Sequence, residues 1–225
     1  MVVVHRWRAW AGLAGAVGGL WFLGFSLILG LARPGYDPSH DAISRLGEQG
    51  SAMPILWNVG GFGVMAACYA VYATAIGSEF ARGWFFWATV LQAVSIAGSG
   101  VFSCDLGCPA ASTSTSGQLH EVFGLSYFAV TCLLPLVAGL TFRRVARWRV
   151  AAPVSYVIGV VLVALFLVGP FLFGAAHIGL WQRLVLVPAL GWQVGISVRL
   201  HRVQLKRLAA NAPQPATDRA GSRLP

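Results

Sequence analysis

The chain has 225 residues, of which 57% are hydrophobic and 10% are charged, and its formal net charge is +9. A soluble domain carries about 25% charged residues, so this composition excludes an ordinary soluble protein and indicates that the lipid bilayer is the solvent. The basic residues lie at the ends of apolar runs rather than on a polar face, which argues against a nucleic-acid-binding protein. We therefore expect membrane lipids, and no nucleic acid, as partners.

Six apolar segments, each close to the roughly 20 residues that cross a bilayer, follow one another along the chain. Lipid offers no partner for unpaired backbone groups, so the predicted fold class is an all-α, polytopic transmembrane bundle. The first segment exceeds the roughly 7–15 apolar residues of a signal peptide, which predicts an uncleaved span. Residues 1–208 form one domain, and residues 209–225 are predicted to be a disordered cytoplasmic tail. The predicted spans are Trp10–Ala32, Met53–Ile76, Gly83–Phe102, Leu119–Phe142, Ala151–Phe173 and His177–Arg199.

The distribution of Lys and Arg predicts how these spans are oriented. Thirteen of the 16 basic residues fall at the chain ends and in the second and fourth connections, whereas the opposite side holds Arg33 and Arg45. Because basic residues gather on the cytoplasmic side of a membrane, both termini are predicted to be cytoplasmic. Loops 33–52 and 103–118 are then extracytoplasmic, in a multi-pass protein of the cell (plasma) membrane.

Most titratable side chains gather on the predicted outer side, although the orientation rule counts only Lys and Arg. Glu79 and Asp218 are the two acidic residues assigned to the inner side. A layer rich in carboxylates and imidazoles predicts a polar site on the outer face. The outer acidic and His residues are Asp37, Asp41, Glu48, Asp105, Glu121, His40, His120 and His177.

The first outer loop reads GYDPSHDAISRLGEQG and predicts a short amphipathic helix. Asp37 and Pro38 fit the N-cap and first helical position, and Gly47 fits the C-terminal stop. One polar stripe is predicted on this helix, in which Asp41 and Arg45 form an i,i+4 ion pair. The stripe either faces solvent at the membrane surface or turns inward over a cavity between the spans. Its members are Asp41, Ser44, Arg45 and Glu48.

The second outer loop contains Cys104 and Cys108, which leave three interpretations open. On an oxidising face of the membrane, a local disulfide can close a tight turn at Gly107. A metal site would add Asp105 and His120, since CxxxC is close to zinc-ligand spacing, although one such pair does not identify a metal. The third possibility is two reduced thiols. We rank them in that order, and the cofactor is left unknown.

His120 and Glu121 fall in the first turns of the fourth predicted span. Thr115 and Gln118 have the spacing of a capping box, which predicts the start of the helix at this point. His120 is interpreted either as a hydrogen-bonded residue of the membrane interface or, because acidic loops surround it, as a group for proton transfer or metal binding.

Two polar features lie inside the predicted spans. Arg183 lies about six residues into the last span, which is about 9 Å deep at a rise of about 1.5 Å per residue. Its guanidinium either extends to the lipid headgroups or pairs with an outer carboxylate of Asp41, Asp105 or Glu121. A weakly polar stripe in the third span, interpreted as interhelical hydrogen bonding or as a substrate path, consists of Gln92, Ser95 and Ser99.

Three motifs together resemble a known family. Residues 41–47 read DAISRLG, residues 104–109 read CDLGCP, and His120 ends the sequence SGQLH. In combination they resemble the domain of unknown function 998 family, over residues 12–200. Ser103 stands where the family pattern has a Pro before the first Cys. The resemblance implies a six-helix bacterial membrane protein and no established activity. Its motif positions here are Asp41, Ser44, Cys104, Asp105, Cys108 and His120.

Two classes of function fit these residues. The first is a membrane-embedded enzyme that acts on a lipid or isoprenoid substrate at its outer face. Its acid–base groups or metal ligands are Asp41, Asp105, His120 and Glu121, and its substrate-binding groups are Ser44, Arg45 and Arg183. The second is a non-enzymatic transporter, sensor or assembly factor, in which a Cys104–Cys108 disulfide staples the outer loops into a cap. The sequence does not choose between them and leaves the oligomeric state open.

Overall fold

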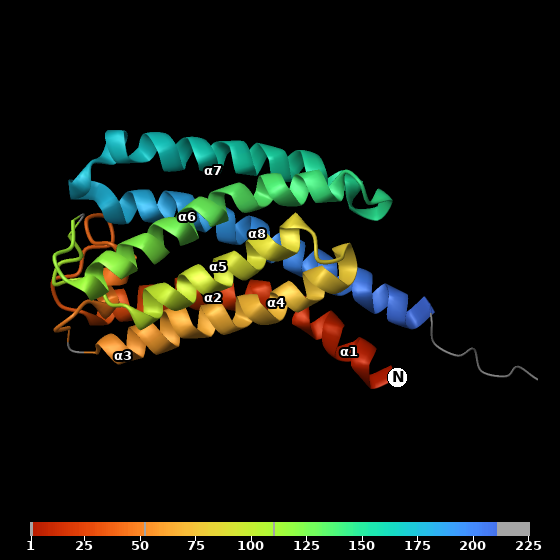
Figure 1. The fold of residues 1–225 in the computed structure, drawn as a ribbon, viewed down its shortest axis with the longest axis horizontal. Helices are drawn as coiled ribbons and strands as arrows, with labels where there is room; N and C mark the ends of the chain where they lie inside the picture. Colours follow the sequence, from red (N-terminus) through yellow and green to blue (C-terminus); the bar gives the residue numbers. More distant parts are fainter. Residues whose placement is uncertain (1, 52, 110, 211–225) are drawn as a thin grey trace, which may run out of the picture.

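The computed structural model describes residues 2–51, 53–109 and 111–210, which fold as a bundle of helices (Figure 1). Short 3₁₀ helices (η1, η3, η4) and one π-helical stretch (η2) interrupt or join the α-helices. In chain order the elements are α1 (Val2–Ala11), α2 (Ala14–Ala32), η1 (Ile43–Gly47), α3 (Pro54–Trp57), η2 (Asn58–Gly63), α4 (Val64–Phe80), α5 (Trp84–Val101), α6 (Thr115–Phe142), η3 (Ala146–Ala151), α7 (Ala152–Phe173), η4 (Ala175–His177) and α8 (Ile178–Ala210).

Six helical stretches of the described chain are long and apolar enough to cross a membrane, which confirms the predicted all-α class with six spans. The last stretch differs most from its predicted bounds, because α8 continues to Ala210 whereas the predicted span ends at Arg199. The added residues are too polar for a span, but Leu, Lys, Arg, Gln and Ala are strong helix formers. Of the predicted tail, residues from 211 onward lie outside the described part of the chain.

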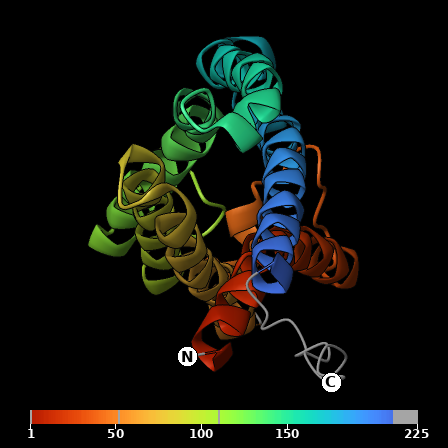
Figure 2. The ribbon, with the colours of Figure 1, turned by 90° about the vertical axis from the view of Figure 1, so that its right-hand side faces the viewer.

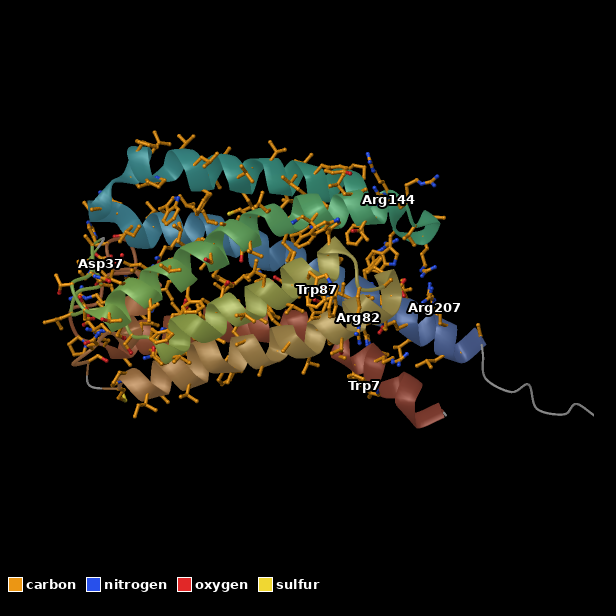
Figure 3. All side chains as sticks on the ribbon, in the orientation of Figure 1. Trp7, Asp37, Arg82, Trp87, Arg144 and Arg207 are labelled. Atoms are coloured by element: carbon orange, nitrogen blue, oxygen red, sulfur yellow. A yellow bond between two sulfur atoms is a disulfide. The ribbon has the colours of Figure 1, made fainter. Side chains whose placement is uncertain are left out.

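The spans alternate in direction, so the connections fall at two ends of the bundle (Figure 1). We call the described residues of 33–53 and 102–114 the cap, and the end where they lie the cap end. We call the opposite end the basic end. Figure 3 shows Asp37 at the cap end and Arg82, Arg144 and Arg207 at the basic end.

The six spans form a ring in chain order (Figure 2). α2 packs against α4, then α5, α6, α7 and α8 follow, and α8 closes the ring against α2. Glycines allow close approach at these contacts, as is usual between membrane helices. A Cβ at Gly18 of α2 would lie 2.7 Å from Cys68 Cβ of α4, and one at Gly98 of α5 would overlap the Phe123 ring of α6.

Inside the ring, buried amides link three spans. Gln92 Nε2 of α5 donates to Thr131 Oγ1 of α6 at 2.9 Å, and Gln193 Nε2 of α8 donates to Gln92 Oε1 at 3.3 Å. Ser99 Oγ donates to the carbonyl of Ser95 within α5. The two bonds of Gln92 favour the interpretation of this part of the polar stripe as interhelical hydrogen bonding, because they satisfy polar groups that lipid cannot.

A buried carboxylate, Glu79, joins three elements at the basic end. Its side chain is 0% exposed, and its Oε1 accepts from Arg147 Nε at 2.7 Å and from Trp148 Nε1 at 2.8 Å. Its Oε2 accepts from Arg207 Nη1 at 2.7 Å. Glu79 therefore ties the end of α4 to η3 and to the extension of α8, a contact that the sequence analysis did not foresee.

We expect Glu79→Leu to destabilise the protein by about 1–3 kcal/mol, because the buried indole N–H of Trp148 loses its acceptor. For a chain of this size that corresponds to a fall in apparent melting temperature of about 2–4 °C per kcal/mol. Thermal unfolding of the purified protein in detergent measures it. Arg144→Leu is the matched control, since this side chain is exposed at the same end. Equal melting temperatures for both variants would contradict a stabilising role of the buried Glu79 contacts.

Candidate functional site

The two predicted outer loops contact each other at the cap end through the backbone N–H of Gln49 and through the side-chain amides of Gln49 and Asn58. Gln49 N donates to the carbonyl of Cys104 at 2.9 Å, and its Nε2 donates to the carbonyl of Ser103 at 3.2 Å. Asn58 Nδ2, at the start of η2, donates to Ser103 Oγ at 2.8 Å and to the carbonyl of Gly47 at 3.2 Å. The two connections therefore form one layer.

A buried carboxylate, Glu48, holds this layer together. Its side chain is 2% exposed, and its Oε2 accepts from the backbone N–H of Gly107 at 2.6 Å. Its Oε1 pairs with the guanidinium of Arg33, which follows α2, and Arg45 Nε lies 3.8 Å from Oε2. A buried carboxylate is very costly unless it is paired and hydrogen-bonded, and Glu48 is both. It joins the end of the first span to both connections.

The first connection is a turn followed by a 3₁₀ helix, whereas the sequence predicts one helix from Asp37 to Gly47. Asp41 N donates to the carbonyl of Asp37 at 2.7 Å, and η1 begins only at Ile43. In a 3₁₀ helix, residues three apart lie above one another. Ile43 and Leu46 therefore both enter the core, which favours this tighter helix over the predicted one.

The predicted polar stripe of this connection turns toward the protein. The ion pair between Asp41 and Arg45 is present, and the Asp41 side chain is only 13% exposed. Glu48 is buried as described, and Ser44 is half-buried. Of the two interpretations, the inward-facing stripe is the one that the structure favours.

Asp105 organises the second connection. Its Oδ2 accepts the backbone N–H groups of Thr113 at 2.8 Å and Ser114 at 3.1 Å, and the Ser114 hydroxyl donates to Oδ1. These hydrogen bonds, that of the Ser114 hydroxyl foremost, lower the pKa of Asp105 to about 2. Ser114 Oγ also accepts from Gly117 N at 3.0 Å, so α6 is capped by Ser114 and not by the predicted Thr115.

Cys104 and Cys108 lie at disulfide-bonding distance, with Cα atoms 5.1 Å apart. This separation is within the usual range of about 4.4–6.8 Å and favours the first of the three interpretations. Gly107 adopts a φ of +80°, which a glycine accommodates readily in such a tight turn. Across residues 2–51, 53–109 and 111–210, no group of three or more His, Cys, Asp or Glu side chains is arranged to hold a metal ion.

Arg183 reaches from α8 to the first connection. Its guanidinium donates to the carbonyls of Pro38 at 2.6 Å and Gly179 at 3.0 Å, and to the hydroxyl of Tyr36 at 2.8 Å. It meets Asp41 through the backbone carbonyl at 3.3 Å, not through the carboxylate. Burial raises the pKa of Tyr36, although Arg183 opposes the shift, so the phenol remains a neutral acceptor. Arg183 therefore connects the cap to the last span through hydrogen bonds.

His120 lies in the first turns of α6, against the end of α5, and is 8% exposed. Its Nδ1 lies 3.0 Å from the carbonyl oxygen of Ser99 and 2.7 Å from that of Phe102. Carbonyl oxygens can only accept, so Nδ1 carries a hydrogen. Its Nε2 makes no hydrogen bond within the part of the chain that the structure describes.

A cavity of about 340 Å³ lies beneath the cap, at the lower end of the roughly 300–1,000 Å³ of small-molecule sites. α2, η1, η2, α5, α6 and α8 contribute to its wall. Most of the wall is apolar, including Phe22, Phe62, Ile96, Leu125, Phe128 and Trp181. Its polar side chains are Ser44, Ser99, His120, Glu121, Tyr127 and Gln182.

The cavity separates the predicted site residues into two groups. Those on its wall are Ser44, Cys104, Cys108, His120 and Glu121. Those bonded within or to the cap instead are Asp41, Arg45, Asp105 and Arg183. Gln182 and Tyr127 are on the wall but were not predicted, because neither belongs to a motif or a polar stripe in its apolar span. The only available signal was that Gln182 precedes Arg183.

Comparison with known proteins identifies one family. The family model described as a protein of unknown function (DUF998) matches residues 16–199. This range contains the cap and most of each span, and it agrees with the extent over which the sequence motifs resemble that family. Searches of curated proteins and of solved structures find no match.

We expect the stabilising effect of Asp105 to depend on pH. A pKa lowered to about 2 in the folded state means that the stabilisation is complete above the unfolded-state pKa of about 4 and is lost as pH falls through about 2. The difference in melting temperature between the wild type and Asp105→Asn should therefore narrow between pH 5 and pH 2. Ser114→Ala removes the principal hydrogen bond to Asp105. In this variant the stabilisation by Asp105 should therefore be lost at a higher pH than in the wild type. A constant difference across this range would contradict the assignment.

Proposed function

The chain belongs to the DUF998 family of proteins of unknown function, and we propose that it binds an amphipathic, lipid-like molecule in the cavity beneath the cap. The observation that carries this proposal is His120. Its side chain is nearly buried, yet Nε2 has no hydrogen-bond partner among the described residues. His120 also lines the cavity, so Nε2 is available for a hydrogen bond to the polar group of a bound molecule, as is usual for the few polar groups in an apolar pocket.

The wall of the cavity supports an apolar tail for this molecule. Phe22, Phe62 and Phe128 are contributed by three different elements and surround the space below His120. Leu125 of α6 lines the cavity while its side chain is largely exposed on the bundle surface. In this proposal a lipid enters the cavity from the bilayer, past Leu125.

His120 and Glu121 are the acid–base groups of an enzyme at this site, because both line the cavity. A neutral imidazole with a free Nε2 can act as a general base toward a bound hydroxyl or water. Asp41 and Asp105, the other catalytic candidates, are held by Arg45 and by the Ser114 backbone and hydroxyl, away from the cavity. In this proposal they position the cap.

A non-enzymatic role is the second candidate, and a different observation favours it. Asp41, Glu48, Asp105 and the Cys104–Cys108 pair all bind other parts of the cap, as expected of a rigid cover for a transporter, sensor or assembly factor. The two candidates share the ligand and differ in turnover. Mass spectrometry of lipid recovered from wild type and from His120→Gln distinguishes them, since only an enzyme returns a chemically altered ligand.

We propose further that residues 1–208 act as one domain in the cell membrane, with the cap outside the cell. The charge asymmetry of the connections supports this orientation. A disulfide in the cap also fits an oxidising compartment.

We expect a photoreactive long-chain probe to label the purified protein on the peptides that contain residues 120–128 and 178–186. Gly124→Phe should abolish this labelling, because Gly124 lines the cavity and a Cβ there meets only Ser99 Oγ, at 4.0 Å. The added ring therefore fills the cavity without straining the helix. Gly24→Phe, on an open surface of α2, is the matched control and should label normally. Unchanged labelling of Gly124→Phe would contradict the proposal.

We expect opposite accessibility of the two ends in intact cells. In a background with Cys68 and Cys132 replaced by Ala, Ala111→Cys marks the cap and Gly83→Cys marks the basic end; both positions are exposed. A membrane-impermeant maleimide should modify Ala111→Cys in intact cells and Gly83→Cys only after permeabilisation. The reverse pattern would contradict the orientation.

A further inference from the structure

The cavity beneath the cap has an unusual set of charges for a lipid-binding site. Among its described wall residues, Glu121 is the one carboxylate, and none is Lys or Arg. The neighbouring arginines are bound elsewhere: Arg33 and Arg45 pair with cap carboxylates, and Arg183 donates to backbone carbonyls and to a tyrosine hydroxyl. An anionic headgroup would therefore meet a like charge and no Lys or Arg counter-ion among the wall residues, which disfavours its binding.

The hydrogen-bonding roles of the polar wall groups follow from bonds already made. His120 Nδ1 donates to two carbonyl oxygens, so Nε2 is the acceptor of this side chain when the imidazole is neutral. Glu121 Oε1 accepts from Ser112 N at 2.6 Å, and its second oxygen also can only accept. These two adjacent groups therefore require a donor from the ligand.

Gln182 of α8, which also lines the cavity, supplies the complementary role. Its Oε1 accepts from the backbone N–H of Ile43 at 2.8 Å, which fixes the orientation of the amide. Its Nε2 is thereby left as a donor toward the cavity that Gln182 lines. Of these three side chains, the two from α6 thus offer acceptors and the one from α8 offers a donor.

We propose that the ligand of this cavity is a long-chain neutral alcohol. A hydroxyl is both a donor and an acceptor, so its hydrogen serves His120 Nε2 or Glu121 while its lone pairs accept from Gln182. An ammonium group can donate to Glu121 but has no acceptor for the Gln182 amide. A carboxylate has no donor for His120 and Glu121, and a phosphate brings negative charge beside Glu121. This inference rests on the proposed function, because it names the chemical class of the molecule bound there.

The test uses four photoreactive probes with the same alkyl chain and different polar groups: a hydroxyl, an ammonium, a carboxylate and a phosphate. Each is crosslinked to the purified wild-type protein in detergent at equal free concentration, and labelling within residues 120–128 is quantified by mass spectrometry. We expect the alcohol to label most strongly and the two anions to label about tenfold less, because they meet the Glu121 carboxylate without a counter-ion.

Glu121→Gln provides the matched variant. The amide oxygen can still accept from Ser112 N, so the start of α6 keeps that contact, while the negative charge is removed. In this variant the anionic probes should gain labelling relative to the alcohol. A wild-type preference for either anion or for the ammonium probe, or an anion-to-alcohol ratio unchanged in Glu121→Gln, would overturn the alcohol assignment and leave the binding proposal standing. Failure of all four probes, or labelling that Gly124→Phe does not reduce, would overturn the binding proposal and the alcohol assignment with it.

Discussion

The arrangement of the cap depends on the burial of one carboxylate, that of Glu48. Its two oxygens receive Arg33 from the end of the first span, Arg45 from the first connection and the N–H of Gly107 from the second. Because an ionised carboxylate without partners is too costly to bury, these segments are held where all of them can reach it. Charge pairing and backbone hydrogen bonds, more than regular secondary structure, therefore determine the conformation of the cap over the cavity.

The basic end of the bundle uses a similar device, and the interior uses a different one. Glu79 is buried between Arg147, Arg207 and the indole of Trp148. Midway along the spans, the contact between Gln92 and Gln193 is uncharged. Ionised groups are expensive within the hydrocarbon and inexpensive near its boundaries. Buried, paired carboxylates accordingly connect the segments at the two ends of the bundle. Midway along the spans, small-residue packing and neutral hydrogen bonds hold the helices together.

The site lies where these two regimes meet. Carbonyls near the end of α5 orient His120, and the second connection orients Glu121 through Ser112 N. The cap therefore does more than cover the cavity, because it decides which atoms of these two side chains are left for a ligand. Below them the wall is aromatic and aliphatic. This change from polar to apolar wall accommodates a ligand with its polar group under the cap and its apolar chain among the helices.

By itself the sequence determined the lipid environment, the six spans, the all-α class and the loops that share one end, because hydropathy and charge act through local composition. It also placed His120, Glu121 and the two cysteines of the cap near one another. Only the tertiary structure decided the partner of each polar group. Glu48 and Glu79 are buried and bonded to several segments, whereas Asp105 bonds within its own loop. Gln182 lines the cavity. These roles depend on contacts between segments far apart in the chain, and a hydrogen bond forms only when both atoms are brought within about 3 Å. No periodicity or spacing along the chain encodes that distance.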